Sequence, residues 1–248
     1  VVRGPAMLLY GTNAVGGLVN VIADSVPSQP LAGAKGGFTG DFGSNGGLGT
    51  GAGDVRVGNS SWALHAGGGG SRSGDYSTPE GVVDNTHSRN VFASTGLSWT
   101  GAKGYIGASY GYEESRYGLP YVEDGLVELT PRRHLVTARG EARELGGFFS
   151  SVRGTFSGRR YRHEELVAGT PETAFRNDTN EFEARAVHRP AGRLTGTMGA
   201  WVLDRDFSAT GEEALAPPVG QTGFAAFAFE EIAWHHATLQ LGGRVDHV

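Results

Sequence analysis

The sequence lacks cysteine altogether and has only 2 methionines among its 248 residues. The absence of cysteine excludes disulfide-stapled folds, zinc sites with thiolate ligands, and thiol catalysis. Acidic residues outnumber basic ones by 26 to 21, so a basic nucleic-acid-binding surface is not expected and no nucleic-acid partner is predicted. Long hydrophobic runs are also missing, because no stretch approaches the roughly 20 apolar residues that a membrane helix needs.

Glycine is the residue in excess, with 42 positions and no Gly-X-Y period, which excludes collagen. The 12 Phe, 8 Tyr and 4 Trp residues are spread through the chain, which argues against disorder. Glycine and aromatic residues without long apolar runs are typical of β-structure. Membrane β-barrels have this composition, and each of their strands gives only a weak hydropathy signal.

From about Gly33 onward, apolar and polar residues alternate with a period of two. In Val91–Gly101, for example, Leu97 and Trp99 alternate with Ser98 and Thr100. Alternation of this kind predicts strands with one apolar face and one polar face. Further predicted strands are Gly104–Glu114, Leu135–Glu144, Arg193–Val202 and Ala237–Val245. We expect about eleven strands of roughly ten residues, close to the length that crosses a membrane.

The connections between these strands alternate between short and long. Short turns are predicted at Asn59–Ser61, Ala102–Gly104, Leu145–Gly147, Pro190–Gly192 and near His235-His236. Long polar loops are predicted at Gly74–Arg89, Tyr117–Pro131, Glu164–Asn177 and Phe207–Gln221. Short turns on one side and long loops on the other are typical of outer-membrane barrels. The alternative is a soluble sheet, which has no reason to keep this asymmetry.

In such a barrel the apolar faces contact lipid and the charged faces line the lumen. A charged residue facing lipid at the bilayer midplane costs about 2–4 kcal/mol, so charge is expected on one face only. The charged residues predicted to face the lumen are Arg139, Glu141, Arg143, Arg153, Arg159, Glu181, Glu183 and Arg185.

The first 24 residues differ from the rest and carry a long motif. Val2-Arg3-Gly4-Pro5, Leu9-Tyr10-Gly11, Gly16-Gly17 and Val19-Asn20-Val21-Ile22 closely resemble the end of the plug domain in TonB-dependent outer-membrane receptors. The resemblance implies a plug end at 1–24, a proline-containing linker at 25–32 and the N-terminal half of a barrel at 33–248. The implied fold class is all-β, a fragment of a 22-stranded transmembrane antiparallel barrel. The signal peptide and the energy-coupling box of the family are expected upstream of this sequence.

The resemblance also implies a function, which is active import across the outer membrane of a Gram-negative bacterium. The implied partners are outer-membrane lipid and the TonB–ExbB–ExbD complex, which would act through the upstream segment. No enzymatic activity and no catalytic cofactor are expected, and the chain has no His-Glu-x-x-His motif. The residues assigned to the plug motif and the plug–barrel contact are Arg3, Gly4, Pro5, Tyr10, Gly11, Gly16, Gly17 and Asn20. Arg3 is expected to pair with a lumenal carboxylate from the set Glu141, Glu181, Glu183, Glu230 and Glu231.

The cargo is predicted to be a scarce metal or metal chelate. Ser73-Gly74-Asp75-Tyr76, Tyr117-Gly118-Leu119-Pro120 and Gly192-Arg193-Leu194-Thr195-Gly196 resemble the zinc-uptake branch of these receptors, which slightly favours zinc over heme or a siderophore. The segment Tyr121–Pro131 departs from that branch because it is short and has no histidine. The candidate metal or ligand residues are Asp84, His87, His163, Glu164 and Glu165, which zinc accepts as ligands. The alternatives are a solvated charged loop for these residues, and a passive porin-like barrel or a barrel-embedded hydrolase for the whole chain.

Overall fold

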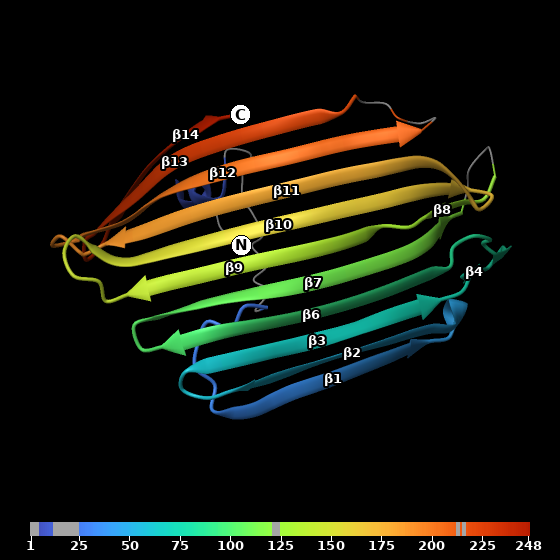
Figure 1. The fold of residues 1–248 in the computed structure, drawn as a ribbon, viewed down its shortest axis with the longest axis horizontal. Coiled ribbons are helices and arrows are strands. Elements are labelled where there is room, and N and C mark those ends of the chain that lie inside the picture. Colours follow the sequence, from blue (N-terminus) through green and yellow to red (C-terminus); the bar gives the residue numbers. More distant parts are fainter. Residues whose placement is uncertain (1–4, 12–24, 121–124, 212–213, 215–216) are drawn as a thin grey trace.

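The period-two segments of the sequence form long antiparallel strands that lie side by side in chain order (Figure 1). The computed structural model describes residues 5–11, 25–120, 125–211, 214 and 217–248. The strands of the large sheet are β1 (Gly33–Gly43), β2 (Leu48–Gly58), β3 (Trp62–Ser73), β6 (Ser88–Gly101), β7 (Gly104–Leu119), β8 (Val127–Leu129), β9 (Arg132–Arg143), β10 (Phe149–Val167), β11 (Thr170–His188), β12 (Leu194–Gly211), β13 (Val219–Ala233) and β14 (Thr238–His247). A separate small hairpin is formed by β4 (Ser77–Thr78) and β5 (Gly81–Val82), and the 3₁₀ helices are η1 (Pro5–Tyr10) and η2 (Asn45–Gly47). No helix among these described residues is long and apolar enough to cross a membrane.

Strands β8 and β9 share one position in the sheet. Both pair with β7 on one side and with β10 on the other, and Thr130 and Pro131 separate them along the chain. Proline has no N–H to give to a ladder, so the pairing is interrupted there. The 12-stranded sheet therefore has eleven positions along its path, as the sequence predicts for this part of the chain.

The connections confirm the predicted short turns and correct part of the predicted long loops. The predicted short turns all join consecutive strands at the same edge of the sheet. At the opposite edge, the predicted loop Glu164–Asn177 is wrong, because β10 and β11 continue through it and only Ala168 and Gly169 connect them. Most of the predicted loop Phe207–Gln221 is likewise strand. Near this edge both faces of the strands carry polar residues, so the alternation of apolar and polar residues disappears from the sequence. The backbone hydrogen bonds between the strands nevertheless continue.

The sheet has two chemically different faces. We call the face that contacts η1 and the segment 25–31 the inner face. Ser109 Oγ donates to Ser25 Oγ there over 3.2 Å, and a Cβ added to Gly96 would lie 1.9 Å from the Ser25 carbonyl oxygen. The opposite, outer face is apolar and exposed: Trp99 keeps 72% of its surface and Ile106 keeps 70%. An apolar face of this extent indicates contact with something other than water.

Candidate functional site: the inner face and its contact with the N-terminal segment

Charged side chains gather on the inner face in ion pairs that cross the strands. Arg153 in β10 donates to Glu141 in β9 over 2.6 Å, and Arg159 in β10 donates to Glu181 in β11 over 2.7 Å. The continuous register of β9, β10 and β11 places all the charged residues predicted for the lumen on this one face. The sequence therefore predicted the charged face correctly, because adjacent residues of a strand point to opposite sides.

Two arginines of the inner face hold the backbone of η1. Arg185 Nη2 in β11 donates to the carbonyl oxygen of Leu9 over 2.9 Å, and Arg244 Nη1 in β14 donates to that of Leu8 over 3.4 Å. The ring of Tyr10 lies 4.9 Å from the Arg185 guanidinium carbon. The last carbonyls of a helix have no partner within it, so guanidinium donors satisfy groups that would otherwise be unpaired.

Phe227 in β13 lies between the two arginines. Its ring centre is 5.7 Å from the guanidinium carbon of Arg185 and 5.4 Å from that of Arg244, within the range of cation–π attraction. Register explains the arrangement, because Arg185, Gly199, Phe227 and Arg244 are consecutive partners across β11 to β14. Gly199 leaves room for the ring, since a Cβ there would lie 2.5 Å from Phe227 Cζ.

Each of the two arginines also has a carboxylate beside it. Arg185 Nε lies 2.6 Å from Glu183 Oε1, and Arg244 Nη2 lies 2.8 Å from Asp246 Oδ1. A cavity of about 510 Å³ lies next to this group, and it is lined by Leu9, Tyr10, Gly11, Glu181, Glu183, Trp201, Leu203, Arg205, Gln221, Arg244, Asp246 and Val248. The site thus combines fixed charges, aromatic rings and open space on the inner face.

The structure covers only part of the predicted plug motif. Arg3, Gly4, Gly16, Gly17 and Asn20 lie outside the described residues, so the pairing of Arg3 stays a prediction. Pro5 begins η1. Tyr10 ends η1 beside Arg185, and Gly11 follows with φ of 123°. Strand β1 begins at Gly33, and the division into plug end and linker stays a prediction as well.

The carboxylates proposed for Arg3 divide between the two faces. Glu141, Glu181 and Glu183 lie on the inner face, each beside an arginine of the sheet, and Glu231 accepts from Gln240 over 2.8 Å. Glu230 corrects the expectation, because it lies on the outer face and pairs with His188 over 2.9 Å. Glu230 and Glu231 are adjacent on a strand, so only one of them can face inward. Sequence reasoning missed Arg244, Phe227 and Asp246 because nothing in their local pattern reports what lies across the sheet.

The candidate metal residues do not converge. His87 Nε2 lies 2.8 Å from Glu128 Oε1, whereas the His163 ring stacks on Phe175 at 4.5 Å. Glu164 lies on the face opposite to His163 and Glu165, and Glu165 Oε1 is 3.4 Å from His163 Nε2. Among the described residues, no hydrogen bond or ion pair joins Asp84 to either group. Among the described residues, no group of three or more His, Asp or Glu could hold a metal ion.

The contact of His87 instead belongs to a loop anchor at the long-loop edge. Asp75 Oδ1 accepts from the backbone N–H groups of Thr86 and His87 over 2.7 and 2.8 Å. The N–H of Thr86 is the largest cause that lowers the pKa of the Asp75 carboxyl. Arg116 donates to Glu128, and that hydrogen bond is the largest cause of a lowered pKa for Glu128. The Asp75 carboxylate therefore closes the segment 74–87 on itself, and the Glu128 carboxylate on β8 ties it through His87 to Arg116 on β7.

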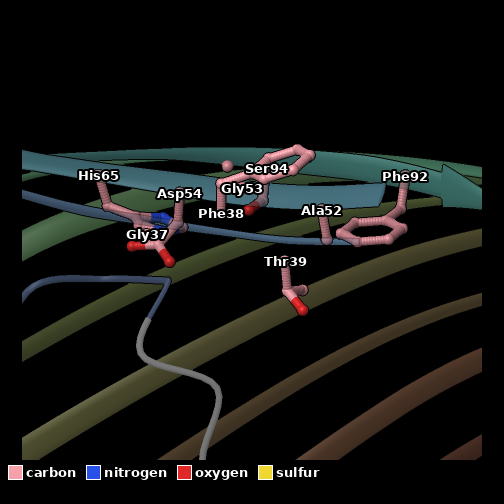
Figure 2. Close-up of a pocket in the computed structure, with 11 residues that line it drawn as sticks. Gly37, Phe38, Thr39, Ala52, Gly53, Asp54, His65, Phe92 and Ser94 are labelled. Carbon is pink, nitrogen blue, oxygen red and sulfur yellow. The ribbon is translucent and has the colours of Figure 1, made fainter. Parts of the chain in front are cut away.

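A second cavity, of about 430 Å³, lies over β1, β2, β3 and β6 (Figure 2). Asp54 and His65 come from neighbouring strands and lie together at one end of it, with Phe92 farther along. His65 is buried and its Nδ1 has no partner among the described residues. Asp54 and His65 therefore make this end of the cavity polar, while Phe38, Ala52 and Phe92 line the rest of it with apolar groups.

Comparison with known proteins identifies the fold. No family model matches the chain. The copper transporter OprC has a TM-score of 0.70 at 17% identity, over 88% of this chain and 37% of its own. The siderophore receptor PirA from Pseudomonas aeruginosa matches with a TM-score of 0.69 and 16% sequence identity. The match covers 98% of this chain and 42% of PirA. A double mutant of the ferric enterobactin receptor PfeA from Pseudomonas aeruginosa matches with a TM-score of 0.68 and 18% sequence identity. The match covers 99% of this chain and 43% of PfeA.

The chain spans about two fifths of the length of these solved structures. At such identities the likeness establishes the fold. The chain is an all-β antiparallel sheet with the fold of part of a TonB-dependent receptor barrel, which is the fold class predicted from its sequence.

Proposed function

We propose that this chain is part of a TonB-dependent outer-membrane receptor that actively imports a scarce metal or metal chelate. The observation that carries the proposal is the hold of Arg185 and Arg244 on the backbone of η1. A large barrel leaves a lumen that must be filled if the membrane is to stay sealed. A passive pore gains nothing from a chain segment held against its inner wall, whereas an importer needs a seal that opens.

The contact is suited to release. The arginines bind main-chain carbonyls, and hydrogen bonds from a charged donor contribute about 1.5–3 kcal/mol each. When η1 leaves, Arg185 keeps Glu183 and Arg244 keeps Asp246, so no buried charge is stranded. The segment is therefore held by contacts that a pulling force can break one at a time. In this proposal the force comes from the TonB–ExbB–ExbD complex and the surrounding partner is outer-membrane lipid.

For the cargo, we propose a metal ion or its chelate, with zinc first and heme or a siderophore next. The names of the similar structures, a copper transporter and siderophore receptors, support metal uptake in general. Motif resemblance alone favours zinc. The same proposal makes the protein a transporter and not an enzyme, located in the outer membrane of a Gram-negative bacterium.

Conductance of the full-length protein in proteoliposomes tests the proposal. We expect no steady open pore in the wild-type protein, because the lumen is filled. Large constitutive conductance would contradict the importer and favour a passive porin-like barrel. Titration calorimetry in detergent with zinc, hemin and a ferric siderophore then identifies the cargo. A tight response to zinc would support the zinc proposal, whereas binding of hemin alone would contradict it.

A further inference from the structure

The inner face of the sheet is built differently over its first strands than over the rest. Over β9, β10 and β11 it carries the ion-paired arginines and glutamates described above. Over β1, β2, β3 and β6, which we call the small-residue wall, most inward positions are glycine, alanine, serine or threonine. On the strands of this wall, all of which the structure describes, Asp41 and Asp54 are the carboxylates that face inward. Asp54 lies in the cavity of Figure 2.

Glycines leave open space around Asp54. Gly37, Asp54, Gly67 and Ser94 are consecutive partners across the four strands of the wall. His65 precedes Gly67 by two residues on β3 and therefore points to the same face. A Cβ added to Gly67 would lie 3.3 Å from Asp54 Cβ and 3.4 Å from His65 Nε2. The carboxylate and the imidazole thus border one space, which is open because residue 67 has no side chain (Figure 2).

Both groups are available to a ligand. The His65 ring is buried, and it forms no hydrogen bond or ion pair within the described part of the chain. Asp54 Oδ2 lies 4.0 Å from Arg56 Nε, whereas the inner-face pair of Arg153 and Glu141 has a contact of 2.6 Å. Burying a polar group without a partner is unfavourable. A ligand shared by Asp54 and His65 would therefore stabilise this part of the wall.

We propose that Asp54 and His65 bind a divalent transition-metal ion, such as zinc, during its passage through the lumen. Carboxylate oxygen and imidazole nitrogen are both ligands that zinc accepts. Two protein ligands leave the remaining coordination positions to water, and the guanidinium of Arg56 repels a cation, so the ion is bound weakly and is released readily. The inference rests on the proposed function in so far as it takes the inner face to line the path of a metal cargo.

The site lies beside the N-terminal segment and away from the arginines that hold η1. Gly96 is the partner of His65 across β3 and β6, and a Cβ added to it would lie 1.9 Å from the carbonyl oxygen of Ser25. The segment 25–31 therefore crosses the wall next to His65. Arg185 and Arg244 contact η1 from β11 and β14, so substitutions at Asp54 and His65 leave that contact intact.

Equilibrium dialysis of the full-length protein in detergent tests the proposal, with zinc chloride alone as the probe. Asp54→Asn/His65→Gln removes both ligands. Asp41→Asn/His134→Gln is the matched control, because Asp41 faces inward outside the cavity and His134 lies on the outer face. We expect the first variant to bind about one zinc ion fewer than the wild-type protein, since neither amide replaces the lost ligand. The control should bind as many ions as the wild-type protein does.

A second variant separates ligand loss from loss of fold. Gly67→Ala keeps Asp54 and His65 but fills the space between them, so zinc should bind at this site about tenfold more weakly. Gly243→Ala, with nothing within 4 Å of its Cβ position, should bind zinc as the wild-type protein does. If Asp54→Asn/His65→Gln melts earlier than the wild-type protein without zinc, Gly67→Ala decides the question.

Unchanged zinc binding by Asp54→Asn/His65→Gln would overturn the inference, and so would unchanged affinity in Gly67→Ala. Neither result touches the importer, because dialysis measures binding without transport. Conductance of the wild-type protein reports on the importer separately, and an open pore there would leave the count of bound zinc ions as measured.

Discussion

Arg185 Nη2 lies 2.9 Å from the carbonyl oxygen of Leu9, a residue 176 positions earlier in the chain. With Arg244 and Phe227, this contact joins the N-terminal segment to strands β11, β13 and β14. The hydrogen bonds to the backbone of η1, the cation–π pairs and the carboxylate partners of both arginines all meet at this one place.

Removing both arginines should free η1 without unfolding the sheet. In Arg185→Gln/Arg244→Gln, hydrogen exchange at residues 7–11 should accelerate about tenfold or more, because charge-assisted hydrogen bonds and cation–π contacts are lost. Mass-spectrometric exchange on the full-length protein measures this. Arg133→Gln is the control, since it breaks an inner-face pair between β9 and Glu113 of β7, which lies outside the cavity beside η1. Equal exchange in both proteins would show that the arginines do not hold the segment.

Filling Gly199 should disturb the same contact indirectly. In Gly199→Ala the new Cβ meets Phe227 and the carbonyl oxygen of Ala184, each at 2.5 Å. Overpacking of this kind costs about 1–3 kcal/mol, so the melting temperature in detergent should fall. Gly243→Ala is the matched control, because nothing lies within 4 Å of its Cβ position. If the two variants melt alike, the close approach of Phe227 is not required.

Filling Gly96 should displace the segment 25–31 from the inner face. A Cβ there would lie 1.9 Å from the Ser25 carbonyl oxygen, and backbone cannot give way as a flexible side chain can. We expect limited proteolysis to cut near residues 25–32 several times faster in Gly96→Ala, because local opening exposes the backbone. Gly101→Ala, whose nearest contact is 3.9 Å away, should be cut at the wild-type rate. Resistance in both variants would place the segment elsewhere.

Acid should loosen the loop anchor at Asp75 and Glu128. Both carboxyls have pKa values lowered in the folded protein, from 3.8 and 4.5 respectively. Their stabilisation is complete above those ordinary values and is lost as the pH falls through the lowered ones. The protection of the amides in residues 74–87, taken as the ratio of the intrinsic to the observed exchange rate at each pH, should therefore fall below pH 4.5. In Glu128→Gln exchange should be faster already at pH 6, and Glu80→Gln, on the same loop, should match the wild type. A pH-independent wild-type loop would contradict the anchor.

The turn between β10 and β11 carries a residue in an unfavourable conformation. Ala168 has φ of 48° and Gly169 has φ of 84°, and two positive values are characteristic of a type I′ hairpin turn. A left-handed conformation costs a residue with a Cβ about 1–2 kcal/mol. Ala168→Gly should raise the stability of this hairpin by up to about 1 kcal/mol, and Ala168→Val should lower it. Thermal unfolding of the two variants in detergent checks the order, and the reverse order would contradict a type I′ turn.

The sequence predicted the strands and the charged inner face because both depend on a period of two. Leu97, Trp99 and Ile106 point to one side in any strand that contains them, whatever its neighbours are. The same reasoning failed at Glu164–Asn177, where polar residues on both faces hide the strand. The register also removes Glu230 from the candidate partners of Arg3, because its neighbour Glu231 takes the inward position.

By itself the sequence determined the all-β class, the eleven strand positions and the separation of apolar and charged faces, because these follow from local alternation and turn residues. The partners of the N-terminal segment were decided only in the tertiary structure. Arg185 and Arg244 meet η1 because four strands bring Gly199 and Phe227 between them in register. In the same way, Arg72, Arg89 and Arg116 become neighbours only when β3, β6 and β7 pair. Local pattern fixes the direction of a side chain, and long-range pairing alone fixes what it touches.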